Sequence, residues 1–177
     1  MSEKQTMAIT HLISGLPCSG KTTYATALRA DLDAALFILD RWLITLFGKY
    51  SIDDVGHEEH VRRVLACRDL IWSAAAELLR RGADVILDDG FFLRENRVRV
   101  IGLSKMVGAS AKIHFVDTPM RVIETRLEVR NAHLPPHNFR IGPDMLHAFV
   151  GLFEAPGADE GAELVHVGAE PHPDAKA

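Results

Sequence analysis

Short apolar runs alternate along the chain with segments whose apolar residues recur every three or four positions. Runs of consecutive apolar residues bounded by glycine or acidic residues are typical of buried strands. Five such runs predict strands, at residues 8–14, 35–39, 83–87, 111–116 and 164–167.

The segments between these runs have helical spacing. The longest covers residues 58–81, where apolar side chains return along one broad face until Gly82 ends the pattern. Further helices are predicted at residues 20–31, 95–107, 120–131 and 144–153, with a short helical turn at 44–49. This β-α-β-α order predicts one α/β domain over residues 1–177, in which helices cover both faces of a parallel sheet.

Composition narrows the class of protein. The chain has 177 residues, 47% of them hydrophobic and 25% charged, which suits one globular domain with a single core. The net charge of -4 counts against a surface that binds nucleic acid throughout, although a local basic groove is compatible with it. Two cysteines predict no disulfide framework, and neither a signal peptide nor a membrane span is expected, so we expect a cytoplasmic protein.

The sequence GLPCSGKT lies between the first predicted strand and the first predicted helix. It matches the phosphate-loop pattern G-x-x-x-x-G-K-[ST], in which backbone amides cradle phosphates. Lys21 is expected to reach the β- and γ-phosphates, and the Thr22 hydroxyl to bind Mg²⁺. The predicted nucleotide-binding residues of this segment are Gly15, Leu16, Pro17, Cys18, Ser19, Gly20, Lys21, Thr22 and Thr23.

Carboxylates follow two other predicted strands. Strand 83–87 runs into Asp88 and Asp89, and strand 35–39 runs into Asp40. We expect them beside the phosphate loop, because ligands of open parallel sheets bind at the carboxyl ends of the strands. Asp88 is predicted to hold Mg²⁺ as a Walker B residue, and the role of Asp89 stays open; if both were partly buried, each would raise the pKa of the other. Asp40 is the predicted general base for an attacking hydroxyl, or alternatively the N-cap of a helix over residues 41–47.

Two arginines precede a loop broken by prolines at residues 133–142. Arg126 and Arg130 are four residues apart, so they share one face of a helix, and guanidinium groups suit phosphate oxygens. We interpret residues 126–142 as a lid whose arginines close over the nucleotide. The alternative is a solvated helix face, because glutamates are interleaved with these arginines.

Aromatic residues are candidates for the wall of an acceptor pocket. Phe91 and Phe92 follow the Asp88 strand, where they either anchor the core or line such a pocket. Trp42 and Trp72 are expected to be packing residues, with Trp42 a second candidate for the wall.

By these motifs the chain resembles the small P-loop kinases of the zeta-toxin, chloramphenicol phosphotransferase and polynucleotide 5′-kinase type. It is most similar to the subgroup described as predicted kinases or AAA-type ATP-binding proteins. The resemblance rests on GLPCSGKT, LDRWLITLFG (39–48), VILDDGFFLRENR (85–97), RLEVRN (126–131) and FEAPGADEG (153–161).

The resemblance implies a three-layer P-loop NTPase fold of the nucleoside-monophosphate-kinase-like type, with a five-stranded parallel sheet and a small lid. It also implies ATP with Mg²⁺ as phosphate donor, a general base that matches Asp40, and lid arginines that match Arg126 and Arg130. Many relatives have D-x-x-R after the second strand, whereas Leu43 occupies the arginine position here and the arginine is Arg41. An acceptor that needs that arginine, such as a nucleic-acid end, is therefore disfavoured.

The leading hypothesis is an ATP-dependent phosphotransferase that moves the γ-phosphate of ATP to a hydroxyl of a small molecule, with Lys21, Asp40, Arg126 and Arg130 in the catalytic centre. One alternative is a polynucleotide 5′-hydroxyl kinase. Another is an ATP-binding regulatory protein that transfers no phosphate. A GTPase is disfavoured because the guanine-reading sequence N-K-x-D is absent from the chain.

Overall fold

Five parallel strands form the central sheet of the protein, in the order β2-β3-β1-β4-β5. The computed structural model describes residues 7–168, and the other residues of the expected domain lie outside this range. The strands are β1 (Ile9–Ser14), β2 (Ala35–Ile38), β3 (Val85–Gly90), β4 (Ser110–Asp117) and β5 (Glu163–Gly168). The predicted parallel α/β sheet is confirmed.

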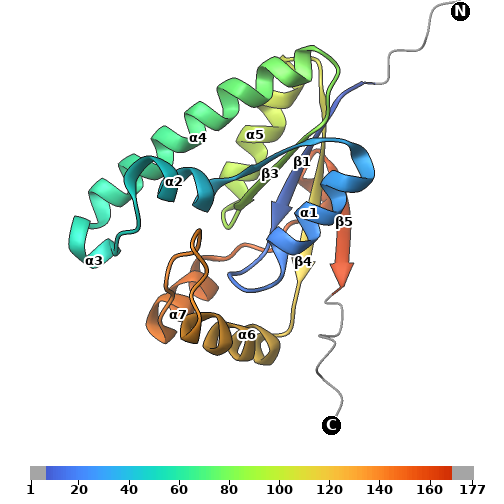
Figure 1. Ribbon diagram of the computed structural model, residues 1–177. Helices are drawn as coiled ribbons and strands as arrows, with labels where there is room; N and C mark the ends of the chain where they lie inside the picture. Colours follow the sequence, from blue (N-terminus) through green and yellow to red (C-terminus); the bar gives the residue numbers. More distant parts are fainter. Residues whose placement is uncertain (1–6, 169–177) are drawn as a thin grey trace, which may run out of the picture.

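Helices cover both faces of this sheet (Figure 1). They are α1 (Lys21–Leu32), α2 (Leu39–Phe47), α3 (Ile52–Val55), α4 (His57–Arg80), α5 (Arg94–Met106), α6 (Met120–Ala132) and α7 (Pro143–Leu152), with a short 3₁₀ turn, η1 (Ala158–Glu160). Helix α1 packs on one face, whereas α4 and α5 pack on the other. Helices α6 and α7 lie beyond the carboxyl ends of the strands, as Figure 1 shows.

Side chains alternate between the two faces along the central strands. Leu12 and Leu87 belong to the apolar cluster under α4 and α5. Their neighbours Ile13 and Ile86 belong to a second cluster with Ala25 of α1. Both sets are buried, and this explains why the strands read as continuous apolar runs in the sequence.

The second strand ends earlier than its sequence predicts. Strand β2 ends at Ile38, and α2 begins at Leu39 and runs to Phe47. The helix predicted at 44–49 is therefore present, but its bounds are wrong, because it begins five residues earlier and ends two residues earlier. Leu39 continues the apolar run of the strand but is the first residue of α2, where it and Leu43 are buried. Asp40 therefore lies in the first turn of α2, and its alternative interpretation as an N-cap is also wrong.

Candidate active site

The phosphate-loop sequence forms the turn that connects β1 to α1. Gly15 has φ 151°, and a Cβ atom there would lie 2.7 Å from the Val116 carbonyl oxygen, so only glycine fits. Gly20 has φ 100° and directly precedes α1. Cys18 has a positive φ of 59°, a conformation that non-glycine residues rarely adopt. The strand–loop–helix context that the motif requires is therefore present.

Lys21 begins α1 and turns back over the loop. Its Nζ donates a hydrogen bond of 2.7 Å to the carbonyl oxygen of Leu16. Burial lowers the pKa of Lys21, and the negative charges of Asp88 and Asp40 oppose that shift. The structure thus brings the lysine close to both carboxylates that the sequence assigned to the same crevice.

Thr22 and Asp88 are in direct contact. The Thr22 hydroxyl donates to Oδ2 of Asp88 over 2.6 Å, although 65 residues separate the two in the sequence. Asp88 is buried, which raises the pKa of its carboxyl group, while Lys21 and the Thr22 hydrogen bond oppose the shift. A hydroxyl and a carboxylate oxygen side by side suit Mg²⁺, which binds oxygen ligands and keeps several positions for water and phosphate.

No group of three or more histidine, cysteine, aspartate or glutamate side chains that could hold a metal ion by itself occurs within residues 7–168. The Thr22–Asp88 pair agrees with this result, because Mg²⁺ in phosphate-transferring proteins takes most of its ligands from water and the substrate.

Asp40 lies near Lys21 and Asp88, since the charges of both act on its pKa. Its side chain reaches solvent, yet the surrounding protein raises its pKa to about 6, chiefly by desolvation. Lys21 and Arg130 oppose this shift, and Asp88 adds to it. Asp40 is therefore a carboxylate that titrates closer to neutral pH than usual, as a general base requires.

Asp88 and Asp89 point to opposite faces of the sheet. Asp88 faces α1, whereas Asp89 accepts two hydrogen bonds from Arg68 of α4, at 2.7 Å to Nε and 2.6 Å to Nη2. The β1–β3 register shifts at this point, from Ile13 opposite Asp88 to Ser14 opposite Gly90, so Asp89 is the extra residue. Burial is the main cause that raises the pKa of each carboxylate, and the charge of Asp88 raises the pKa of Asp89 further, as the sequence predicts for one of the two.

Arg68 is a residue of this site that the sequence analysis missed. It lies in the apolar stripe of α4, four residues after Val64 and four before Trp72. The sequence did contain a signal for it, which is a single arginine at helical spacing within an apolar stripe that faces the core. Such a charge needs a buried partner of opposite charge. Asp89 is that partner.

The two predicted lid arginines approach the phosphate loop from α6. Arg126 Nη1 donates to the carbonyl oxygen of Ser19 over 3.1 Å. Arg130 donates to the carbonyl oxygen of Phe139 over 3.4 Å, and its charge acts on both Lys21 and Asp40. The Nε of Arg130 is buried and has no hydrogen-bond partner among residues 7–168. A buried, unsatisfied guanidinium donor beside the phosphate loop is what an anionic ligand would satisfy.

The predicted lid touches both the phosphate loop and the segment after α2. Cys18 packs against the apolar cluster formed by α6 and α7. Burial raises the pKa of its thiol, while Arg130 and Lys21 oppose the shift. On the other side, Lys49 Nζ donates to the Pro135 carbonyl oxygen over 3.0 Å, so the loop is joined to the segment after α2.

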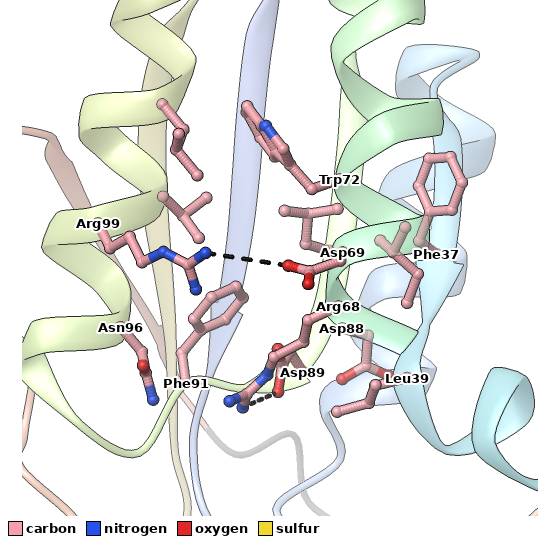
Figure 2. Close-up of a pocket in the computed structure, with 14 residues that line it drawn as sticks. Phe37, Leu39, Arg68, Asp69, Trp72, Asp88, Asp89, Phe91, Asn96 and Arg99 are labelled. Carbon is pink, nitrogen blue, oxygen red and sulfur yellow. Dashed lines mark hydrogen bonds and ion pairs between the residues drawn. The ribbon is translucent and has the colours of Figure 1, made fainter. Parts of the chain in front are cut away.

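A pocket lies between α4 and α5, next to the carboxyl end of β3 (Figure 2). Phe91 is buried and lines this pocket together with Trp72. Phe92 instead packs against the rings of Phe149 and Phe153. Trp42 contacts the ring of Phe37, and of the two tryptophans Trp72 lines this pocket.

The fold and the site define a P-loop nucleotide-binding protein of the α/β class. Residues 11–156 match the family described as "AAA domain", and the chain belongs to this family. No curated protein matches the chain in sequence. Over the described residues, no helix has both the length and the apolar character needed to cross a membrane.

Several solved structures are similar in fold. A protein of Chloroflexus aurantiacus to which kinase activity is ascribed superposes with a TM-score of 0.73 at 20% identity, covering 92% of this chain and 89% of the other. A sugar kinase of Janibacter sp. has a TM-score of 0.66 at 15% identity, with 93% and 87% coverage. Chaetomium thermophilum Kti12 in complex with ADP-AlF3 has a TM-score of 0.68 at 18% identity, with 93% and 91% coverage. At these identities the similarity establishes the fold.

Proposed function

We propose that this protein is an ATP-dependent phosphotransferase that moves the γ-phosphate of ATP to a hydroxyl group of a small-molecule acceptor. The observation that carries the proposal is the convergence of Lys21, Asp88 and Asp40 at one end of the sheet, where the charge of each acts on the pKa of another. Within the narrower group that the sequence resembles, such a constellation serves transfer rather than switching.

The phosphate-binding half of the site supplies positive charge. The amides of the loop and the amino end of α1 face the phosphates, and Lys21 gives up its contact with the Leu16 carbonyl to reach them. Thr22 and Asp88 would hold Mg²⁺, which neutralises charge on the phosphate oxygens. The unsatisfied Nε of Arg130 adds a further donor. A bound nucleotide analogue in a protein of the same fold supports this nucleotide role.

Asp40 is the proposed general base. Its carboxylate takes the proton of the acceptor hydroxyl, the freed oxygen forms a bond to the γ-phosphorus, and the bond from that phosphorus to the bridging oxygen breaks so that ADP leaves with the electron pair. A pKa of about 6 keeps Asp40 ionised at neutral pH while leaving it a stronger base than an ordinary carboxylate. Closure of residues 126–142 over the site would exclude water and limit hydrolysis.

Transfer can be measured with γ-labelled ATP, Mg²⁺ and panels of alcohols, sugars, nucleosides, antibiotics and oligonucleotides. We expect a labelled phosphate ester of a small molecule, lost in Asp40→Asn and retained in Asp54→Asn, an exposed acid of α3. Labelled oligonucleotide ends would instead identify a polynucleotide kinase. ATP turnover to free phosphate alone, unchanged in Asp40→Asn, would remove Asp40 as the base and contradict transfer.

A further inference from the structure

The pocket between α4 and α5 opens beside the proposed phosphate-transfer site. Its enclosed volume is about 50 Å³, less than the roughly 300–1,000 Å³ of typical small-molecule sites, and it opens to solvent, so a ligand would lie only partly inside it. Leu39 and Asp88 lie at the end of the pocket near the carboxyl ends of β2 and β3 (Figure 2). Leu39 directly precedes Asp40, the proposed base, and Asp88 is hydrogen-bonded to Thr22, its partner in the proposed Mg²⁺ site. This end of the pocket therefore adjoins both.

The body of the pocket is apolar. The rings of Phe37, Trp72 and Phe91 come from β2, α4 and the end of β3 (Figure 2). Aliphatic side chains of α5, Val100 and Leu103, close the opposite wall. Aromatic walls of this kind bind flat or aliphatic groups by burial and by contact with the ring faces.

Every charged side chain around this apolar body has an opposite charge nearby. Arg68 donates two short hydrogen bonds to Asp89, which neutralises both groups. Arg99 of α5 reaches across the pocket toward Asp69 of α4, with 3.9 Å between Nη2 and Oδ1 (Figure 2). These are the two cations among the described lining residues, and both face carboxylates.

The charge balance therefore disfavours an anionic acceptor. A carboxylate or phosphate in the pocket would meet Asp89, and the two cations of the lining already face carboxylates, so this like-charge contact would be costly. Each oxygen of Asp89 accepts one hydrogen bond from Arg68 and retains a second lone pair. It can accept a hydrogen bond from an acceptor hydroxyl while Arg68 holds it in place.

We propose that this pocket is the acceptor subsite and that it selects an uncharged alcohol with an apolar body, whose hydroxyl groups lie toward Asp89 and Asp40. The proposal rests on the phosphotransferase function, but it concerns binding and can be tested without transfer. Arg68 is a positioning residue, because it acts through Asp89 rather than on the acceptor itself.

A matched ligand pair tests the charge selection. 3-Phenyl-1,2-propanediol and 3-phenyllactate share an apolar body and a hydroxyl group, and they differ in a neutral CH₂OH against a carboxylate. Ligand-observed NMR with the unmodified protein measures binding of each without ATP. We expect the diol to bind about tenfold more tightly, because the carboxylate meets uncompensated negative charge. Equal or tighter binding of the carboxylate overturns the proposal.

A blocking variant and a matched control variant test the location. Val100→Trp fills the pocket from α5, and Val98→Trp adds the same side chain on the exposed side of the same helix. We expect the first to abolish binding of the diol and the second to leave it unchanged, with thermal unfolding as the check on folding. Asn96→Trp, at another half-buried position of the lining, serves as the blocking variant if Val100→Trp does not fold. Undiminished binding in a folded blocking variant overturns the proposal.

The outcomes separate the two proposals. Binding of the diol in this pocket without any phosphate transfer to it or to other alcohols supports the subsite and removes the transferase function. Transfer to an anionic acceptor, in a protein that does not bind the diol, supports the transferase function and overturns the subsite.

Discussion

Arg97 and Glu160 form an ion pair that is completely covered by the rest of the protein. Both side chains have 0% exposure, and two hydrogen bonds of 2.7 Å join the guanidinium of α5 to the carboxylate of η1. Burial alone would raise the pKa of Glu160, but hydrogen bonds from Arg97 and from the Gly157 amide outweigh it, and the pKa lies below its usual value. Arg97 also donates to the Phe91 carbonyl oxygen over 2.9 Å, just after the active-site carboxylates.

Replacing Arg97 by methionine leaves Glu160 buried without its charge partner. Removing one partner of a buried pair costs about 3–5 kcal/mol, a large part of the 5–15 kcal/mol typical of a domain. With a urea m-value of about 2 kcal/mol/M, the unfolding midpoint should fall by about 2 M. If Arg97→Met does not fold, Glu160→Gln keeps the shape and removes the negative charge, and we expect a smaller shift in the same direction.

A second arginine of α5 provides the control. Arg94 forms a similar two-bond pair with Asp159, but side-chain exposures of 44% and 76% leave that pair in solvent. Arg94 Nη1 also lies 3.7 Å from Glu160, but it makes no hydrogen bond to that carboxylate and is itself partly in solvent. Arg94→Met should therefore shift the urea midpoint much less than Arg97→Met, because solvent screens exposed charges. Equal midpoint shifts for Arg97→Met and Arg94→Met would refute the reasoning that burial sets the strength of this contact.

Three further predictions concern single groups. The Cys18 thiol should be alkylated more slowly when ATP and Mg²⁺ are present, and an unchanged rate of labelling by iodoacetamide would show that the loop is not occupied as described. Thr22→Val should weaken nucleotide binding about tenfold with Mg²⁺ and little with EDTA, measured by titration calorimetry, because the hydroxyl contributes through the metal. Burial lowers the pKa of His114 to about 4, so the folded state binds fewer protons than the unfolded state. The contribution of His114 to the free energy of unfolding should be complete above pH 6.5 and decrease as the pH falls toward 4. In urea titrations, the free energy of unfolding of His114→Gln should decrease less over this pH range.

The sequence was sufficient for features that depend on neighbouring residues. The phosphate loop is a continuous segment between a strand and a helix, and its pattern predicts its geometry and its place in the fold. The position of Asp88 beside the phosphate loop followed from the rule that parallel strands share their carboxyl edge, whereas its hydrogen bond with Thr22 is seen only in the structure.

Contacts between distant segments could not be predicted from the sequence. Arg68 and Asp89 meet across 21 residues and Arg97 and Glu160 across 63, and in each case the chain offers several alternative partners of the same charge. The opposite orientation of Asp88 and Asp89 depends on strand alternation and on the register shift at Ser14, which only the paired strands define. The early start of α2 was missed because Leu39 extends an apolar run equally well as strand or helix.

The central claim, that Asp40 removes the proton of the acceptor hydroxyl, is tested most directly by the pH dependence of kcat/KM for an acceptor found in the panel. With a pKa raised to about 6, Asp40 is protonated at low pH and cannot accept a proton, so the rate should fall as pH decreases. At pH 5 the rate should be about one tenth of its plateau value, and this acidic limb should disappear from the residual activity of Asp40→Asn. An acidic limb that persists unchanged in Asp40→Asn would contradict the account.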